Sequence, residues 1–201
     1  MAINQANMLK VAQALRSGEF TQAKGALHRV NPPVWIQEAL ADPEHTEHRQ
    51  AQNDNEREVG LCCLGVACEV ALREGVVQRR RLDIENSRLL SDVYEYGIFD
   101  VPDPEGGEPY SDSFLPPAVR EWIGVETGDI LFKLEGDKLT KALNAGVEFY
   151  NRQYEREGVL IVSASVLNDR MGFTFEDMAD LFESGKIMAS DYKDAPELER
   201  V

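Results

Sequence analysis

The sequence predicts a mainly α-helical domain, with α+β as the alternative class, built around one buried helix at about residues 61–74. Two observations support this prediction. From Leu61 to Leu72 only Glu69 is charged, and the larger side chains recur at helical spacing. A helix that is apolar almost all round belongs in the interior, because a surface helix would show a polar face. We expect the other helices to pack around it, with short strands or a hairpin in the insertions.

Amphipathic helices are expected near both ends of the chain. Residues 4–16 carry apolar side chains at helical spacing, and Ser17-Gly18 follows them as a stop signal. Near the other end, Thr174 and Asp177 have the form of a capping box that opens a helix over 175–182. Together with a helix over 115–125, these segments are expected to enclose the buried helix.

The remaining segments are interpreted from the same signals. In chain order we expect a short helix or ordered turn over 19–27, a helix over 34–40, a surface loop over 42–58, a strand over 76–82, a helix over 84–99, a loop over 100–114, a strand over 130–134, a helix over 137–156 and a turn over 168–172. Residues 159–162 fit a strand or the start of a helix equally well.

We expect one globular domain over 1–189, with an acidic insertion at about 83–137 and a loosely ordered tail over 190–201.

The charge of the chain is strongly acidic and unevenly distributed. The 201 residues include 21 Lys and Arg and 36 Asp and Glu, net −15, and residues 83–137 alone carry net −11. Such a field repels nucleic-acid phosphates, so direct nucleic-acid binding is not expected. It attracts a basic surface, including the groove of a nucleic-acid-binding protein. The alternative is an acidic surface that only keeps the protein soluble.

The three cysteines lie inside the apolar segment and predict buried, reduced thiols. The low-probability alternative is a zinc site formed by Cys62, Cys63, Cys68, His45 and His48. The two histidines have a suitable spacing, but adjacent cysteines on a helix point about 100° apart. A nucleophilic cysteine would need a histidine or cation beside it, and the histidines lie outside this segment. No cofactor or metal is therefore expected.

The sequence gives little support to an enzyme. It contains no Gly-x-Ser-x-Gly, P-loop or Rossmann glycine pattern. The N-terminal residues lack a basic region followed by an apolar run, and no stretch approaches 18 apolar residues. We expect a cytoplasmic protein without catalytic residues and without a membrane partner.

Four short segments carry a resemblance. They are ALRSGEF at 14–20 with Gln22 and KGAL at 24–27, GLCCLGV at 60–66, LPP at 115–117 with Val119 and Trp122, and LND at 167–169 with Gly172, Phe175 and ADL at 179–181. Together they resemble a family of small proteins encoded by tailed phages and prophages, in which an aromatic residue usually stands at the position of Leu61. That family has no established general activity. The resemblance implies a phage origin, an infected host cell as the location, and a mostly helical core.

Phage origin and charge together favour one function and leave two alternatives. The leading hypothesis is a non-enzymatic accessory protein that binds and modulates a host protein, of a defence or nucleic-acid-handling complex, by an acidic surface that imitates nucleic acid. Its partner-binding residues are expected to be Asp100, Asp103, Glu105, Glu108 and Asp112. One alternative is a small-ligand or nucleotide-binding, sponge-like protein whose pocket is lined by Arg79, Arg80, Arg81, Asn168, Asp169 and Arg170. The other is a metal-dependent hydrolase that uses Asp169 and nearby acids.

Overall fold

The computed structural model describes residues 2–23, 27–31, 58–81, 92–99, 110–111, 114–145 and 160–188. Several predicted segments lie outside these ranges, namely the helix over 34–40, most of the loops over 42–58 and 100–114, and the tail over 190–201. Everything that follows about structure concerns the described residues.

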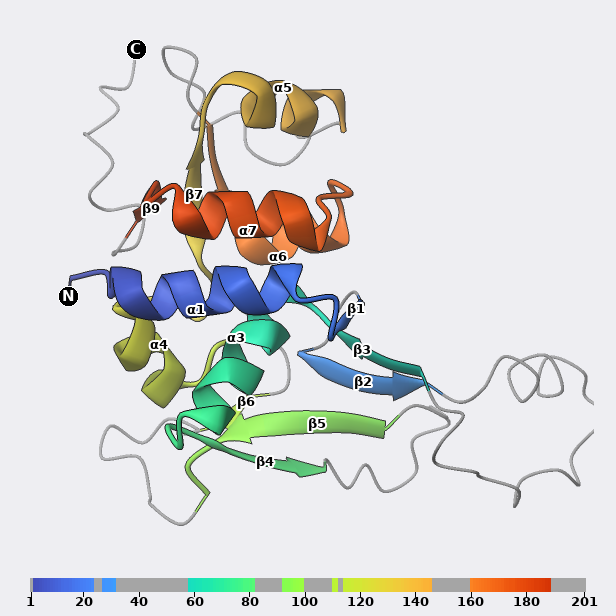
Figure 1. The fold of residues 1–201 in the computed structure, drawn as a ribbon, viewed down its shortest axis with the longest axis vertical. Coiled ribbons are helices and arrows are strands. Elements are labelled where there is room, and N and C mark those ends of the chain that lie inside the picture. Colours follow the sequence, from blue (N-terminus) through green and yellow to red (C-terminus); the bar gives the residue numbers. More distant parts are fainter. Residues whose placement is uncertain are drawn as a thin grey trace, which may run out of the picture.

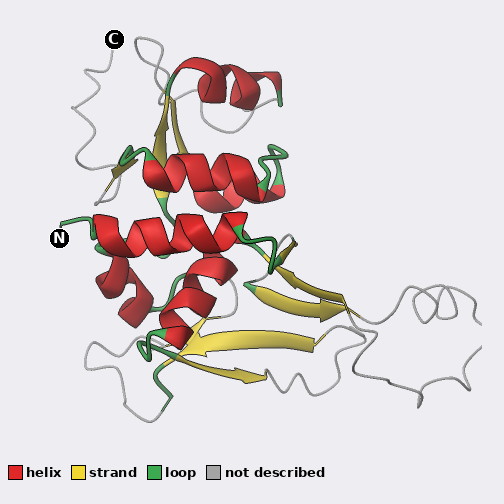
Figure 2. Ribbon diagram, viewed as in Figure 1, coloured by secondary structure: helices red, strands yellow, loops and turns green. Residues whose placement is uncertain are grey.

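The fold is α+β with a helical core, and two small sheets extend from it (Figure 1, Figure 2). Its helices are α1 (Gln5–Arg16), α3 (Cys63–Arg73), α4 (Pro117–Ile123), α5 (Gly136–Asn144), α6 (Ala164–Asp169) and α7 (Phe175–Glu183). Its strands are β1 (Thr21–Gln22), β2 (His28–Asn31), β3 (Glu58–Leu61), β4 (Gln78–Arg81), β5 (Asp92–Gly97), β6 (Tyr110–Ser111), β7 (Leu131–Leu134), β8 (Leu160–Ser163) and β9 (Ile187–Met188).

The larger sheet has the order β1-β3-β2-β5-β4, and β6 pairs with the end of β5. Its strands run antiparallel to their neighbours, except that β1 and β3 are parallel. Strand β4 lies at the edge, since β5 is its only partner among the described strands, and all four of its residues are exposed. The smaller sheet, β8-β7-β9, lies at the opposite end of the molecule beside α5 (Figure 1).

The predicted buried helix is confirmed as α3. Every residue from Cys63 to Ala71 is buried, including Glu69, and the helix packs against α1, α4 and α6. We expected the C-terminal helix to contact it as well. Instead α7 packs mainly against α1, and the two helices run side by side in opposite directions across the middle of the molecule (Figure 1).

A close backbone approach fixes the start of α3. A Cβ atom added to Gly65 would lie 1.7 Å from the carbonyl oxygen of Leu27, so only glycine leaves room for that carbonyl. The preceding residues are held in the same way, because the amide of Ala23 donates to the carbonyl of Leu61 at 2.7 Å and β1 pairs with β3. Strand β1, Ala23 and Leu27 therefore lie close to the start of α3.

Most of the predicted elements are confirmed, with small shifts of their ends. The helices at 4–16, 115–125 and 175–182 and the strands at 76–82 and 130–134 correspond to α1, α4, α7, β4 and β7. Helix α4 ends at Gly124, whose φ of 82° gives the left-handed cap that the sequence suggests. Thr174 and Asp177 form both hydrogen bonds of the capping box. The predicted helix over 137–156 is α5, which ends at Asn144.

The predicted helix over 84–99 is wrong for residues 92–97, which form β5, the strand between β2 and β4. Residues 84–91 lie outside the described residues. Within β5 Val93, Tyr94 and Tyr96 are β-branched or aromatic and favour a strand, whereas the prediction relied on apolar spacing across a longer window. The sheet supplies partners on both sides of β5, and these non-local hydrogen bonds decide the conformation.

Two open choices are resolved. Within 19–27 the structure shows the two-residue strand β1 rather than a helix. Residues 160–163 form β8 and the chain enters α6 at once, so the strand and helix interpretations each describe half of the segment. Asn168 and Asp169 belong to the end of α6, and the predicted turn begins after them, at Arg170.

The approach of Leu27 to Gly65 yields the first prediction. Replacing glycine by alanine inside a helix normally stabilises by about 1 kcal/mol. Here we expect Gly65→Ala to lower the free energy of unfolding by at least about 3 kcal/mol, because the new methyl group meets a backbone carbonyl. Urea denaturation followed by circular dichroism measures the change.

The matched control is Gly18→Ala. Gly18 has a φ of 72° but no atom within 4 Å of an added Cβ, so only backbone strain of about 1 kcal/mol is expected. Equal effects of the two substitutions would contradict the role assigned to the Leu27 contact.

Candidate functional site

Two of the four resemblance segments, the first and the last, meet at Asn168. Its side chain is fully buried, and its Nδ2 donates to the carbonyl of Ala23 at 2.9 Å and to Oδ1 of Asp169 at 2.6 Å. The Nε2 of Gln22 donates to Oδ1 of Asn168 at 2.8 Å and to the carbonyl of Phe173 at 2.7 Å. These bonds join the segment after α1 to α6 and to the entry of α7. Asn168 therefore connects these segments, and the side-chain amides of Gln22 and Asn168 both form hydrogen bonds within the fold.

The cysteines lie in the same region, at the start of α3. Cys62 caps the helix, and its thiol accepts from the amide of Gly65 at 3.4 Å. Cys63 contacts the carbonyl of Ala164 at 3.6 Å, and Cys68 is also fully buried. Burial raises the pKa of the Cys62 thiol to about 12, despite the opposing hydrogen bond from Gly65, and raises those of Cys63 and Cys68 well above the ordinary value. All three are neutral thiols of the interior.

The zinc alternative finds no further support in this region. Among the described residues, no group of three or more His, Cys, Asp or Glu side chains is placed to hold a metal ion. His45 and His48 lie outside those residues, so this part of the prediction has no counterpart in the structure.

The arginines of β4 are committed to carboxylates. Arg79 pairs with Glu69 and Arg80 with Glu95, and both acids are buried. The guanidinium of Arg79 lies 5.4 Å from the ring centre of Tyr94, and that of Arg80 lies 4.2 Å from the ring centre of Phe99. Arg81 is exposed at the end of the strand.

The hydroxyl of Tyr96 adds a third polar group around Glu69. It donates to Oε1 of Glu69 at 2.6 Å. Burial and then the nearby Glu69 carboxylate raise the pKa of Tyr96, which keeps the hydroxyl a donor. The buried acid on α3 is thereby compensated by Tyr96 and Arg79, and this cluster holds the β4-β5 hairpin against the central helix.

The predicted ligand pocket is not assembled as expected. Strand β4, with Arg79, Arg80 and Arg81, lies at one end of the molecule, while α6, with Asn168 and Asp169, lies behind α7 on the other side of α3 (Figure 1). The interactions described above tie each group to its own surroundings. The prediction groups these residues because of their residue types alone. In the fold they lie apart.

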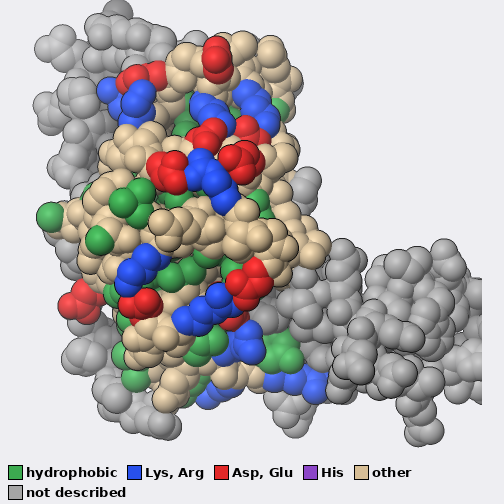
Figure 3. Space-filling view, in the orientation of Figure 1, with side chains coloured by type: hydrophobic (Ala, Val, Ile, Leu, Met, Phe, Trp, Pro, Cys, Tyr) green, Lys and Arg blue, Asp and Glu red, His purple; other side chains and the backbone are tan. Residues whose placement is uncertain are grey.

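Charges on the described surface are balanced. The described residues contain 13 Lys and Arg and 16 Asp and Glu, net −3, whereas the other segments together contain 8 and 20, net −12. Figure 3 shows acidic and basic side chains interspersed on one face rather than separated. The five acids predicted to bind a partner, Asp100, Asp103, Glu105, Glu108 and Asp112, lie outside the described residues. The excess negative charge thus belongs to segments other than the described fold.

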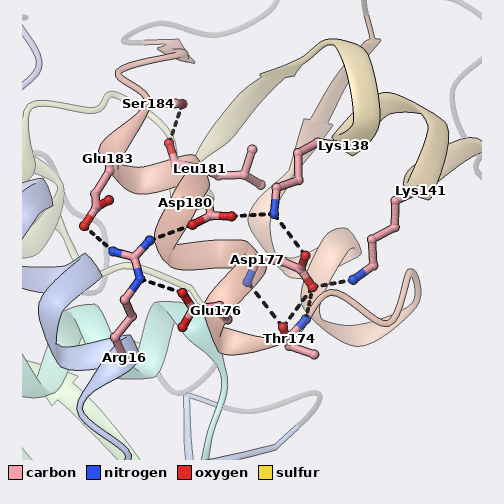
Figure 4. A network of polar contacts seen from close by, with 10 residues as sticks. All are labelled: Arg16, Lys138, Lys141, Thr174, Glu176, Asp177, Asp180, Leu181, Glu183 and Ser184. Atoms are coloured by element: carbon pink, nitrogen blue, oxygen red, sulfur yellow. Dashed lines mark hydrogen bonds and ion pairs between the residues drawn. The ribbon is translucent and has the colours of Figure 1, made fainter.

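A network of ion pairs joins α1 to α7 (Figure 4). Arg16, in the last turn of α1, reaches three acids spaced along α7. Its Nε donates to Glu176 at 2.9 Å, its Nη2 donates to Asp180 at 2.6 Å, and its Nη1 donates to Glu183. One guanidinium thus spans two turns of the neighbouring helix.

The same network continues to α5 through two lysines. Lys138 donates to Asp177 at 3.0 Å and to Asp180 at 2.8 Å, and Lys141 donates to Asp177 (Figure 4). Partial burial alone would raise the pKa of Asp177, but the hydrogen bonds from Lys141, Thr174 and Lys138 outweigh it and hold that pKa well below its usual range. These acids balance cations within the fold.

One surface pocket contains side chains that the sequence reasoning missed. It lies where β6, the start of α4 and the entry to β7 meet, has a cavity volume of about 410 Å³, and is called here the α4 pocket. Its main lining residues are Ser111, Phe114, Pro116, Pro117, Arg120 and Asp129. The sequence predicts only a helix start at 115–117. The available signal is an aromatic residue, Phe114, two positions before Pro116-Pro117, with Arg120 one helical turn later.

No described helix has the length and apolar character needed to cross a membrane. The described fold and its surface define an α+β protein with a buried central helix, balanced charges and an open pocket beside α4. A family model described as a domain of unknown function (DUF8296) matches residues 33–186, and the chain belongs to that family. No curated protein and no solved structure matches the chain.

Burial of the thiols gives a direct prediction about their reactivity. At pH 8 a thiol with a pKa of about 12 is ionised in only about one molecule in ten thousand, and its sulfur is shielded from reagent. We expect Ellman's reagent to modify native protein at least about 100-fold more slowly than protein unfolded in guanidinium, in which all three cysteines react. Rapid modification of one thiol in the native state would show an accessible, activated cysteine.

The lowered pKa of Asp177 predicts a pH dependence of stability. Because the folded pKa lies below the unfolded value of about 3.9, the charged form stabilises the fold above about pH 5, and this contribution is lost as the pH falls through 4 toward the folded pKa. We expect Asp177→Asn to lower the free energy of unfolding by about 1 kcal/mol at pH 7. The difference from wild type should shrink steadily below about pH 4.

Urea denaturation at a series of pH values checks this behaviour. Glu121→Gln, which neutralises an exposed carboxylate on α4, is the control and should change stability by less than about 0.5 kcal/mol. A constant difference between wild type and Asp177→Asn down to about pH 2 would show that the charge of Asp177 does not stabilise the fold.

Proposed function

We propose that this protein is a non-enzymatic phage accessory protein that binds and modulates a host protein through an acidic surface within residues 83–137. The observation that carries the proposal is the separation of charge along the chain. The described fold has net −3, while the remaining segments have net −12. An acidic protein of this kind selects a partner with a basic surface.

The pairing of cations within the fold supports this assignment. Nine Lys and Arg residues of the described part form ion pairs, namely Lys10, Arg16, Arg73, Arg79, Arg80, Lys133, Lys138, Lys141 and Lys186. Their positive charge is largely neutralised by acids of the same fold. Residues 100–112, by contrast, contain five acids and no Lys or Arg in the sequence.

The partner is inferred from the chemistry that such a surface favours. A run of carboxylates spaced along a segment presents negative charge in the way that phosphates do along a nucleic acid. It would occupy the basic groove of a host protein that handles nucleic acid, or of a defence complex, and compete with the natural ligand. The phage origin rests on the four resemblance segments, and it places the encounter in the cytoplasm of the infected cell.

Charge reversal tests the proposal. Asp100→Lys, Asp103→Lys, Glu105→Lys and Glu108→Lys are combined in one variant, and Asp191→Lys, Asp194→Lys, Glu197→Lys and Glu199→Lys in a matched control. Both variants change the net charge by the same amount. Tagged proteins are used to capture partners from infected host cells at about 50 and about 500 mM salt, and the bound proteins are quantified by mass spectrometry.

We expect wild type and the control to retain the same basic host protein at low salt and to release it at high salt. The reversal at 100–108 should lose it at both salt concentrations, because electrostatic complementarity determines the encounter. Retention by the 100–108 variant, or loss from both variants alike, would reject the assigned surface.

A further inference from the structure

We propose that the α4 pocket binds a nucleotide, which is a ligand with a flat ring that carries N–H donors and with an acidic group attached. This inference rests on observations other than the charge of the chain, although the pocket residues lie within 83–137, the range proposed to contain the acidic surface. It rests on the arrangement of Phe114, Arg120 and Asp129 around one cavity of about 410 Å³, a volume within the range of small-molecule sites.

The walls of the pocket are fixed by backbone hydrogen bonds. The amide of Leu115 donates to the carbonyl of Gly128 at 2.7 Å, and the amide of Phe114 donates to the hydroxyl of Ser111 at 2.9 Å. Pro116 and Pro117 open α4 and have restricted φ angles. The pocket therefore exists before a ligand arrives, and binding does not require a disordered segment to fold.

Phe114 supplies a flat apolar face. Its side chain is 54% exposed, the highest value among the large hydrophobic residues of the described part. Gly128 lies under it, and a Cβ there would approach the Phe114 Cβ to 3.1 Å, so the glycine lets the aromatic residue sit close to the turn. An exposed ring beside a pocket of this size suits stacking against a nucleobase, because every base has a π-face.

Arg120 supplies the cation, with most of its donors uncommitted. Nη1 donates to the carbonyl of Glu126 at 3.1 Å, while Nε is buried and has no hydrogen-bond partner in the structure. A buried donor without an acceptor is uncommon, and it leaves the hydrogen-bonding capacity of Arg120 incompletely used within the fold. A guanidinium that lines a pocket suits a phosphate, to which it donates two parallel bonds.

Asp129 explains why a simple anion is not the preferred ligand. Its Oδ1 accepts from the amides of Ile130 at 2.8 Å and Ser165 at 3.2 Å, and its Oδ2 accepts from the Ser165 hydroxyl. These bonds, together with one from the Ser163 hydroxyl, hold the carboxylate in place at the pocket wall. A ligand that places N–H groups at Asp129 and a phosphate at Arg120 forms hydrogen bonds with both side chains.

The overall negative charge does not prevent such binding. At physiological ionic strength, exposed charges more than about 8 Å away are largely screened, so nearby groups, Arg120 and Asp129 among them, set the field at the ligand. The charge of the chain instead predicts weak binding of free phosphate, which has no ring to stack on Phe114 and no donor for Asp129.

Isothermal titration of the full chain tests the proposal at about 150 mM salt. The probes are the four ribonucleoside monophosphates, the corresponding nucleosides and inorganic phosphate, each up to about 1 mM. The variants are Phe114→Ala, Phe114→Trp and Arg120→Gln, with Lys186→Gln as a control that removes one cation far from the pocket along the chain. Because Phe114 is exposed, its substitutions keep the fold intact, which circular dichroism verifies for every variant.

We expect at least one nucleotide to bind, and Phe114→Ala to weaken its binding roughly 5- to 100-fold. Arg120→Gln should weaken it at least about tenfold, while Phe114→Trp and Lys186→Gln retain affinity. The proposal is overturned if no nucleotide binds, if nucleosides or phosphate alone bind as tightly as nucleotides, or if Phe114→Ala has no effect. Because these titrations contain no host partner, their failure leaves the acidic-surface proposal to its own experiment.

Discussion

The approach of the Leu27 carbonyl to the backbone of Gly65 is the contact on which the rest of the structure depends. It presses the segment after α1 onto the first turn of the buried helix. At that distance β1 pairs with β3, and the Gln22 side chain reaches Asn168 on α6. A larger residue at position 65 would push Leu27, β1 and Gln22 away from α3 at the same time. The local cysteine-rich motif is thus best understood as a packing motif, in which small and apolar side chains allow two backbones to meet.

The helical half of the fold was predictable because its signals are local. The spacing of apolar residues in α1 and α3, the proline start of α4 and the capping box of α7 each lie within a few residues of one another. The larger sheet was not predictable, because β2 pairs with β3 and β5, which lie far from β2 along the chain. Apolar spacing over 84–99 also fits a helix, and only the neighbouring strands decide that Tyr94 and Tyr96 belong to β5.

The candidate sites were predictable to different degrees. That the cysteines are interior follows from their apolar neighbours and their spacing, and the structure agrees. The α4 pocket follows from no local pattern, because Ser111, Phe114, Arg120 and Asp129 come from two strands' ends and a helix that the fold brings together. The charge of Arg79 and Arg80 suggested a ligand, but the buried acids Glu69 and Glu95 on α3 and β5 already take those cations. Sequence alone does not show which acid lies opposite which base.

Strand β4 has a further consequence for the behaviour of the protein in a crowded cell. A strand at the edge of a sheet can pair with another extended chain, and charged side chains on such a strand oppose that pairing. Among the described strands β4 has only β5 as a partner, and its four residues, Gln78–Arg81, are exposed. Two copies that approached one another along β4 would set guanidinium groups against one another. The arginines that anchor β4 and β5 to the core thereby also oppose pairing of two copies along this strand.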